Sequence, residues 1–567
     1  MPFLPTTKKE IRRLGWDRPD IIIVSGDSYV DSPHMGTAVI GRVLEDAGFR
    51  VAIIAQPDTA SEKDITRLGS PRLFWGVTAG SIDSMVANYT AVGKRRKSDD
   101  YTPGGINDRR PDRAIIVYTN LIRRIFKNDK VPIVLGGIEA SLRRISHYDF
   151  QSDKIRRSVL FDSKADLLVY GMGEKSAITL AKAMDAGMEY RDIRGICYIS
   201  KEKPNGYIEL PSYEEVMNDR QKFIECFHAF YKNNDPINGK GLIQKHGDRY
   251  LVHNPPSPAL SEKELDRIYE LDFQREVHPY YKKEGHVKAL DTIKFSITTH
   301  RGCYGECNFC AITIHEGRTV QSRSAGSVIR EVRRITRHPD FKGYIGDVGG
   351  PTSNMYGFEC RRKLEKGSCV NRRCLYPRIC PNLKPDHSKQ VDLLVKIRKV
   401  QGVKKAFVAS GIRYDLLLSD RVNHMNYLKE ITSHHVSGQM KVAPEHSQPK
   451  ILELMGKPDT DSLLEFKKIF EQLSKSALKK QFLTYYFIAA HPGCRLADMR
   501  RLRSFVKGEL GLKPEQVQIF TPTPSTYSTL MYYSELNPFT NEKIFIEKSY
   551  KGKVKQKEMI LGEYESA

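Results

Sequence analysis

One eleven-residue stretch constrains this 567-residue chain more than any other. The stretch, HRGCYGECNFC, begins at His300 and places Cys303, Cys307 and Cys310 in a C-x-x-x-C-x-x-C spacing. It follows an alternating, strand-like run at 292–299. Thiolates are the usual protein ligands of iron–sulfur clusters, so three of them can hold three irons of a [4Fe-4S] cluster and leave the fourth iron open. A small ligand can bind that iron, which is a catalytic arrangement.

Two other interpretations of the loop stay open. A structural zinc site needs four ligands, usually from paired C-x-x-C hooks, whereas this loop offers three, with Phe309 before the last. The other alternative is three loop cysteines that bind no metal. Clustered cysteines in an intracellular chain usually bind metal or act in catalysis, so the cluster is the favoured hypothesis.

The spacing, with an aromatic residue before the third cysteine, resembles that of radical S-adenosylmethionine (SAM) enzymes. In that superfamily the open iron binds the amino and carboxylate groups of SAM. An electron from the cluster then cleaves SAM to methionine and a 5′-deoxyadenosyl radical, which abstracts hydrogen from the substrate. The cofactor carries this chemistry, and the protein supplies position and seclusion.

The loop belongs to a region of strand–helix repeats that runs from Thr292 to about residue 525. Helices such as 326–336 and 461–473 separate six predicted strands, at 292–299, 343–350, 405–412, 437–444, 482–490 and 516–524. Without a Rossmann phosphate fingerprint, six such units predict a partial (β/α)6 barrel. Active sites of barrels lie at the carboxyl ends of the strands, and the three-cysteine loop follows the first strand.

Residues 1–215 predict a doubly wound α/β domain, because strands at 20–27 and 51–57 are joined by a helix at 36–49. The order resembles a cobalamin-binding domain, whose Asp-x-His-x-x-Gly loop supplies the cobalt ligand. The comparable residues here, Asp31, His34 and Gly36, depart from that spacing by one residue on each side. The resemblance implies the fold, but cobalamin is a doubtful cofactor, and His34 also reads as an ordinary loop histidine.

Residues at the other strand ends are candidate site residues. In radical SAM enzymes a glycine pair after the second strand meets the SAM amino group, which implies that role for Gly349 and Gly350, although Pro351 replaces the usual acidic residue. Arg413, after the third strand, resembles the arginine that pairs with the SAM carboxylate. Its alternative is a structural bond to nearby backbone. Glu445 and His446, after the fourth, could orient substrate or transfer protons.

A second set of cysteines follows the second strand, at Cys360, Cys369, Cys374 and Cys380. Four cysteines so close together rarely occur without a metal in a reducing compartment. Their spacing is irregular for a zinc ribbon, so a second iron–sulfur cluster is slightly favoured over zinc, with plain surface thiols as the alternative.

The composition indicates in which compartment the protein works and which kinds of partner it can attract. No secretory signal or apolar run of ~18 residues occurs, so we expect a soluble cytoplasmic protein without a membrane span. In that compartment the ten cysteines stay free or metal-bound. The net charge of +23 would attract anions, including RNA, although a generally basic solvated surface explains it equally well.

Several stretches together resemble YgiQ-type radical SAM proteins over nearly the whole length, among them RPDRAIIVY from Arg110, GGIEASLRR from Gly136 and GGPTSNMYG from Gly349. We expect a Rossmann-like, cobalamin-binding-like domain at 1–215 and a helical linker region at 216–291. A radical SAM core that forms a partial barrel should follow at 292–540, and a C-terminal tail at 541–567.

The sequence thus predicts a radical SAM enzyme that cleaves SAM reductively and takes hydrogen from a substrate that the residues do not identify. The resemblance implies a reducing partner such as flavodoxin or ferredoxin. A radical SAM enzyme that modifies RNA is an alternative motivated by charge. An alternative from another class is a non-catalytic, metal-bound RNA-binding or scaffold protein.

Overall fold

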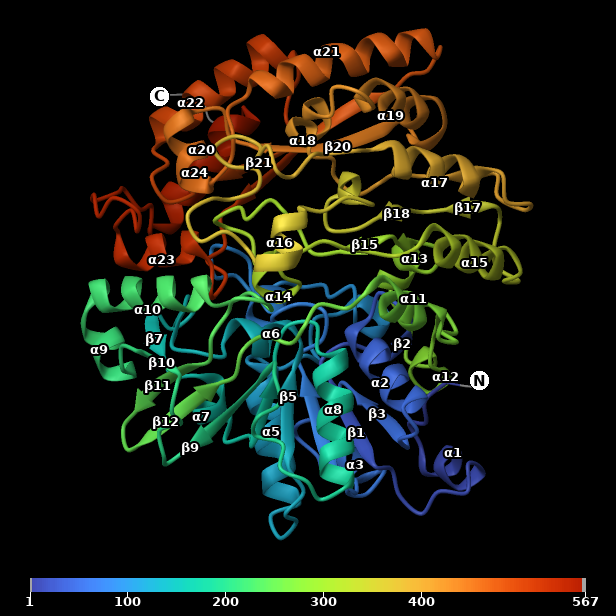
Figure 1. Cartoon of the computed structure of the whole chain (residues 1–567), viewed down its shortest axis with the longest axis vertical. Helices are drawn as coiled ribbons and strands as arrows, with labels where there is room; N and C mark the ends of the chain where they lie inside the picture. Colours follow the sequence, from blue (N-terminus) through green and yellow to red (C-terminus); the bar gives the residue numbers. More distant parts are fainter. Residues whose placement is uncertain (1–2, 563–567) are drawn as a thin grey trace. The chain divides into compact units, whose positions relative to one another are not determined.

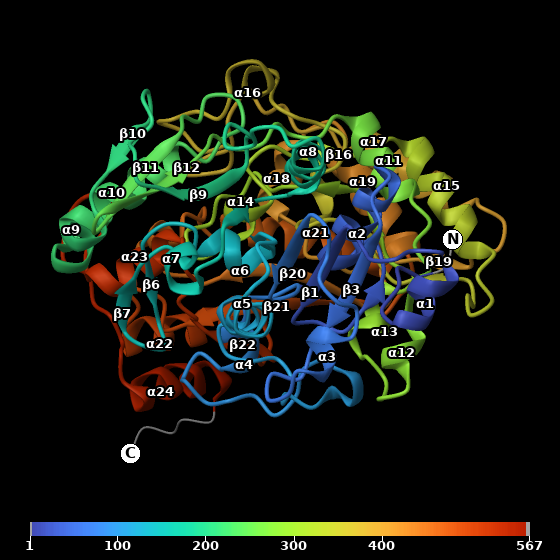
Figure 2. The ribbon, with the colours of Figure 1, turned by 90° about the horizontal axis from the view of Figure 1, so that it is seen from below.

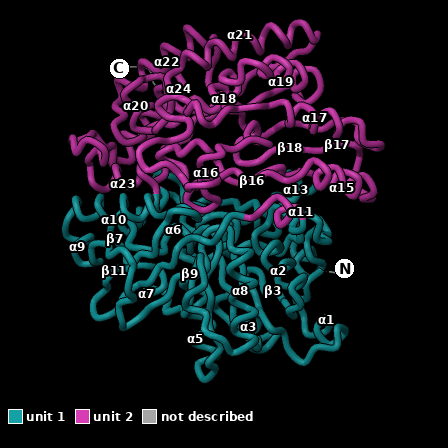
Figure 3. The backbone as a smooth tube through the Cα atoms, viewed as in Figure 1, with its two compact units in different colours: residues 1–259, 267–294, 523–525 teal, residues 260–266, 295–522, 526–567 magenta. Residues whose placement is uncertain are grey.

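The computed structural model describes residues 3–562 and divides the chain into two compact units (Figure 3). Unit 1 takes in the chain up to Ala259, then Arg267–Lys294 and Thr523–Ser525. Unit 2 takes in Leu260–Asp266, Phe295–Pro522 and the chain from Thr526 onward.

Unit 1 is built on a nine-stranded sheet that begins with β10 (Ile208–Leu210) and has the order β10-β11-β12-β9-β8-β5-β4-β1-β3. Its parallel half is formed by β3 (Val51–Ala55), β1 (Ile21–Ser25), β4 (Phe74–Thr78), β5 (Ile133–Gly136) and β8 (Leu167–Val169). The strands β1 and β3 are buried at every position, because a parallel sheet is covered on both faces and its strands are therefore continuous apolar runs.

Helices cover both faces of this half-sheet (Figure 2). Helices α2 (Gly36–Asp46) and α8 (Glu174–Asp185) pack against each other over β1 and β3. Helices α5 (Ala114–Ile125) and α7 (Val159–Ser163) contact each other on the opposite side. The N-terminal domain is therefore doubly wound, as predicted.

The segment 216–291 is not the helical linker that its composition predicted. It contains α10 (Arg220–Lys232), but it also supplies β11 (Leu242–His246) and β12 (Arg249–His253). These antiparallel strands join the sheet beside β9 (Ile196–Ser200). The missed signal is Gly247-Asp248, a two-residue turn between two strand-like runs, which is a hairpin signature.

Unit 2 contains six parallel strand segments that pair in chain order. Segment β14 (Ile297–Thr298) pairs with β18 (Val348–Gly349), and β17 (Tyr344–Ile345), earlier in the same segment as β18, pairs with β19 (Lys405–Ala406). A parallel bridge between Ile412 and Val442 leads to β20 (Gln439–Glu445), which is followed by β21 (Phe482–Ala489) and β22 (Gln516–Ile519). This succession is a partial (β/α)6 barrel, as predicted.

Helices surround these strands and enclose the core of unit 2 (Figure 1). Helix α15 (Ala325–Thr336) is typical: Ser324 caps its first turn, and Val328, Val332 and Ile335 form its buried stripe. The predicted C-terminal tail contributes α24 (Tyr550–Leu561), which packs on β22 and on α22 (Leu496–Phe505). None of the helices within residues 3–562 is long and apolar enough to cross a bilayer.

Candidate metal centre

The three cysteines of the HRGCYGECNFC stretch lie in the loop between β15 (His300–Arg301) and α14 (Ile312–His315). A Cβ on Gly305 would lie 3.3 Å from the Cys303 sulfur and 3.5 Å from the Cys307 sulfur, so both thiols flank the same point. The Cys310 backbone N–H donates to the Cys307 carbonyl at 3.0 Å, which folds the third cysteine back toward the second. The loop thus brings the Cys303 and Cys307 sulfurs together and turns the chain back at Cys310, although no three His, Cys, Asp or Glu side chains in the described part of the chain converge on one metal position.

The loop thiols affect one another's titration. Burial raises the pKa of Cys303 to about 11, and the neighbouring Cys307 contributes to the rise. Burial also raises the pKa of Cys310, with Cys307 and then Cys303 adding to it. The three cysteines are half-buried. As thiolates they would repel one another and be stabilised by bound cations, so the chemistry of this donor set suits an iron–sulfur cluster.

The loop is fixed to unit 2 by hydrogen bonds on both sides of the cysteines. The fully buried Tyr304 donates its hydroxyl to the Phe358 carbonyl. Asn308 donates its backbone N–H to the Met455 carbonyl at 2.8 Å and its side-chain amide to the Leu454 carbonyl at 2.9 Å. The sulfurs are therefore held by a rigid frame, as a preorganised ligand set requires.

Gly349 and Gly350 end the second strand beside this loop. The Gly349 carbonyl accepts hydrogen bonds from the Thr299 backbone N–H at 2.7 Å and from the Thr299 hydroxyl at 3.1 Å. A Cβ on Gly350 would lie 2.6 Å from the His300 Nε2 atom, so only glycine fits there. The glycine pair has a packing role, and Gly349 also has a structural hydrogen-bond partner for its carbonyl.

Arg413 lies directly against the thiols. Its Nη1 atom is 3.6 Å from the Cys307 sulfur and would be 3.4 Å from a Cβ on Gly305. Its other two nitrogens form a bidentate pair with Asp415, Nε to Oδ1 at 2.8 Å and Nη2 to Oδ2 at 2.5 Å. Against the effect of burial, Asp415 holds the pKa of Arg413 well above its usual value. Asp415 therefore aims a permanent positive charge at the cysteine loop.

The sequence analysis did not predict a role for Asp415. The signal was present as Arg-x-Asp in the run SGIRYD. The backbone of Arg413 is also fixed, since Asn354 accepts its N–H at 2.9 Å and donates to its carbonyl at 3.0 Å. The guanidinium is thus positioned from both ends.

Glu445 and His446 end the fourth strand at an irregularity in the pairing of β20 with β21. Burial raises the pKa of Glu445 even though Lys457, whose Nζ lies 3.5 Å from its Oε1 atom, acts in the opposite direction. Burial lowers the pKa of His446 to about 3, and its Nε2 atom is 3.6 Å from the Cys494 sulfur. Lys457 is a further site neighbour that the sequence reading missed.

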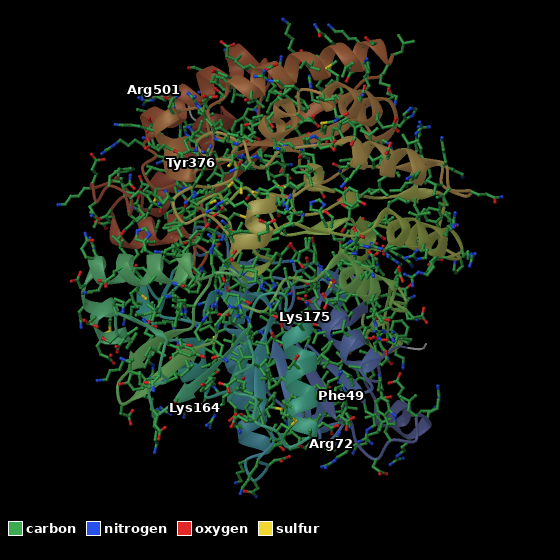
Figure 4. All side chains as sticks on the ribbon, in the orientation of Figure 1. Phe49, Arg72, Lys164, Lys175, Tyr376 and Arg501 are labelled. Atoms are coloured by element: carbon green, nitrogen blue, oxygen red, sulfur yellow. The ribbon has the colours of Figure 1, made fainter. Side chains whose placement is uncertain are left out.

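The second cysteine set lies in the same unit, where sulfur atoms gather near the labelled Tyr376 (Figure 4). Cys360 and Cys380 are buried, and Cys374 packs in one cluster with Cys360 and Cys303. The sulfur of Cys369 instead faces the Arg362 guanidinium at 2.6 Å. No three His, Cys, Asp or Glu side chains within residues 3–562 converge on a single metal ion. A second metal site remains a prediction.

The loop that resembles a cobalamin ligand loop lies in unit 1. Asp31 is fully buried and forms a two-point pair with Arg42, with Nε to Oδ1 at 3.2 Å. Its strand β2 (Val30–Asp31) pairs with β13 (Glu276–Val277). His34 precedes α2, which begins at Gly36. Asp31 therefore has a structural partner within a strand, and His34 and Gly36 lie at the start of α2.

Comparisons with known proteins identify the family. The family model described as "Radical SAM N-terminal" matches residues 3–296. A UPF0313 protein of Fusobacterium nucleatum is 57% identical over 560 residues, 99% of each chain. A UPF0313 protein of Thermotoga maritima is 52% identical over 562 residues, 99% of this chain and 98% of the relative.

A solved structure of the cobalamin-dependent S-adenosylmethionine radical enzyme OxsB with aqua-cobalamin bound is similar in fold. It has a TM-score of 0.52 and 13% sequence identity, and the match covers 92% of this chain and 56% of OxsB. At that identity the likeness bears on the fold alone, where it agrees with a doubly wound domain and a partial barrel. The resemblance drawn from the motifs is confirmed: the chain belongs to the UPF0313 family and is a radical SAM enzyme.

Proposed function

We propose that Cys303, Cys307 and Cys310 hold a [4Fe-4S] cluster whose open iron binds SAM. When bound, the cluster and SAM supply an electron and a 5′-deoxyadenosyl radical that abstracts hydrogen from the substrate. The observation that carries the proposal is the position of two thiols and a guanidinium around Gly305, each within 3.5 Å of its Cβ position.

The chain's own residues would hold SAM by charge and shape. Arg413 keeps its Nη1 edge toward the cysteine loop, because Asp415 occupies the opposite edge. A carboxylate beside the loop would therefore meet a fixed donor with little loss of side-chain freedom.

Anaerobic reconstitution with iron and sulfide tests the proposal. The reduced, reconstituted protein should convert SAM to 5′-deoxyadenosine, and a non-catalytic scaffold should not. A reducing partner such as flavodoxin or ferredoxin is part of the proposal, and chemical reduction by dithionite makes the test independent of it.

Replacing Arg413 tests the SAM contact separately from the cluster. Arg413→Lys removes the fork and should weaken SAM binding about tenfold or more, since a charged hydrogen bond contributes about 1.5–3 kcal/mol. SAM binding is measured by equilibrium dialysis on reconstituted protein of equal iron content. Arg398→Lys is the matched control, because Arg398 also pairs with a carboxylate, that of Glu430 at 2.8 Å. The Arg398→Lys protein should bind SAM as well as the unmodified protein does.

RNA is a second candidate substrate class, favoured by a basic surface at the amino ends of the barrel strands. Lys405 pairs in register with Tyr344 and, together with burial, lowers the pKa of Lys479. Tyr344 and Phe482 are exposed there, and such rings can stack on bases. RNA retained by purified protein at low salt and released at high salt would support this candidate. No RNA affinity at low salt would remove it.

A further inference from the structure

In doubly wound sheets, ligands bind beyond the carboxyl ends of the strands, where the strand order reverses. In unit 1 the chain passes from β1 to β3 on one side and then returns to β4 on the other, so this position lies between β1 and β4. We infer that the chain's own segment 94–113 occupies this position and that unit 1 binds no cobalamin there.

The two strand ends first close on each other. A Cβ on Gly26, directly after β1, would overlap the Ala79 carbonyl oxygen, directly after β4. A Cβ on Gly80 would overlap the Asp27 carboxylate, which also accepts the Ser81 N–H at 2.6 Å. Backbone and carboxylate are therefore in contact where a ligand would enter the crevice.

A buried triad of Arg110, Asp27 and Asp99 then joins the segment to the ends of β1 and β4. Arg110 of the segment donates through Nη2 to Asp27 at 2.7 Å and to Asp99 at 3.0 Å. The side chains of Arg110 and Asp27 are 0% exposed, and that of Asp99 is 5% exposed. The single cation thus bonds to both buried carboxylates, and withdrawing the segment would take that cation away from Asp27, which is unfavourable.

Further hydrogen bonds hold the segment in place. Gln56, at the end of β3, donates to the Thr102 hydroxyl at 2.7 Å and to the Gly26 carbonyl at 2.9 Å. The Ser28 N–H donates to the Tyr101 carbonyl at 3.0 Å. The segment therefore bonds to the loop after β1 and to the end of β3, on both sides of the reversal.

Gly137 and Glu139, which follow β5 beside the triad, also make contacts within unit 1. A Cβ on Gly137, after β5, would overlap the Thr78 hydroxyl, so this glycine serves packing. The buried Glu139 accepts the backbone N–H groups of Ser84 at 2.6 Å and Ile115 at 3.4 Å. Asp31 is likewise bound to Arg42, whereas the Arg110 Nε and Ser28 Oγ atoms at this edge are buried without a hydrogen-bond partner among the described residues.

The residues therefore do not fit the cofactor that is bound in the similar OxsB structure. This inference concerns unit 1 and is independent of the proposed cluster site in unit 2. The N-terminal domain keeps the doubly wound fold, and segment 94–113 fills the position where a ligand would bind.

Cobalt retention tests the inference on the full chain. The reconstituted protein is incubated anaerobically with excess hydroxocobalamin, desalted, and analysed for cobalt and iron per chain. We expect full iron and no cobalt above the amount that an unrelated protein carries through the same column. Cobalt retained in a one-to-one ratio with the chain would overturn the inference.

Hydrogen–deuterium exchange of the unmodified protein gives a second readout. Backbone amides of the segment that donate inside unit 1, such as Gly104 to the His286 carbonyl, should exchange as slowly as the sheet. They should be unchanged when hydroxocobalamin is added. Rapid exchange, or protection that appears only with cobalamin, would show that the segment leaves the position and would contradict its permanent occupancy.

Discussion

The carboxyl edges of the two sheets occupy equivalent places in their folds but differ in chemistry. In unit 1, Arg110 bonds to both Asp27 and Asp99, and all three side chains are buried. In unit 2, the Cys303 and Cys307 sulfurs flank one point beside Gly305, and Arg413, 3.6 Å from the Cys307 sulfur, already shares its charge with Asp415. The fold provides the position at both edges, and the loop sequence decides whether the chain fills it or leaves donors for a cofactor.

The largest expected effect follows from removing one thiol. Cys307→Ala should abolish both the cluster absorbance and SAM cleavage, because two thiols cannot replace the three-point attachment. Cys226→Ala is the matched control, since this buried cysteine of unit 1 contacts Gln244 at 3.5 Å and should leave both signals intact. Full SAM cleavage by Cys307→Ala would contradict the ligand assignment.

The complementary change breaks the closed edge of unit 1. Arg110→Met leaves two buried carboxylates without a cation and should lower the free energy of unfolding by about 3–5 kcal/mol, measured by urea denaturation. Arg109→Met removes a neighbouring arginine whose pair with Glu284 is partly exposed, and it should cost less than about 1 kcal/mol. Equal losses in the two variants would mean that the triad has no special role.

The second cysteine set sharpens the comparison within unit 2. If it binds its own cluster, a variant with Cys369→Ser and Cys374→Ser should contain less iron per chain than the unmodified protein while still cleaving SAM. Iron is counted by colorimetric assay after reconstitution. An unchanged iron content would remove the second site.

The smallest effect concerns the opposite end of the sheet in unit 1. Burial alone would raise the pKa of Asp20 above the ordinary 3.8. Hydrogen bonds from Arg50 and Arg72 instead lower this pKa to about 2 (Arg72 is labelled in Figure 4). A lowered pKa contributes stability that is present above about pH 4 and is lost as the pH falls toward 2. Asp20→Asn should therefore cost about 1 kcal/mol at neutral pH.

Thermal unfolding at several pH values checks this prediction. The difference in melting temperature between the unmodified protein and Asp20→Asn should shrink as the pH falls from 5 to 2. A difference that stays constant over that range would show that the carboxylate charge does not contribute.

The sequence predicted the local features of both edges and missed the distant ones. The spacing of the cysteines predicted their common loop, and apolar runs predicted the strands of the barrel and of the doubly wound domain. Each of these features depends on residues that are neighbours in the sequence. The hairpin at Gly247-Asp248 had a local signal that was overlooked. The triad of Asp27, Asp99 and Arg110 joins residues 83 positions apart, and no periodicity encodes such a contact.

The distinction between the two edges also needed the structure. Arg413 had a functional and a structural interpretation in the sequence, and Asp31 was compared only with the cobalamin ligand loop. The structure shows that both are paired with a charged residue, Asp31 with Arg42 and Arg413 with Asp415. Only Arg413 keeps a donor edge toward the cysteines, and that direction is a property of the folded loop.

The most direct test of the central claim is the yield of 5′-deoxyadenosine from SAM, measured by chromatography and mass spectrometry on reconstituted, dithionite-reduced protein. The account predicts production that requires the reductant and disappears in Cys307→Ala. A fully reconstituted protein that binds iron at the three cysteines yet forms no 5′-deoxyadenosine would contradict it.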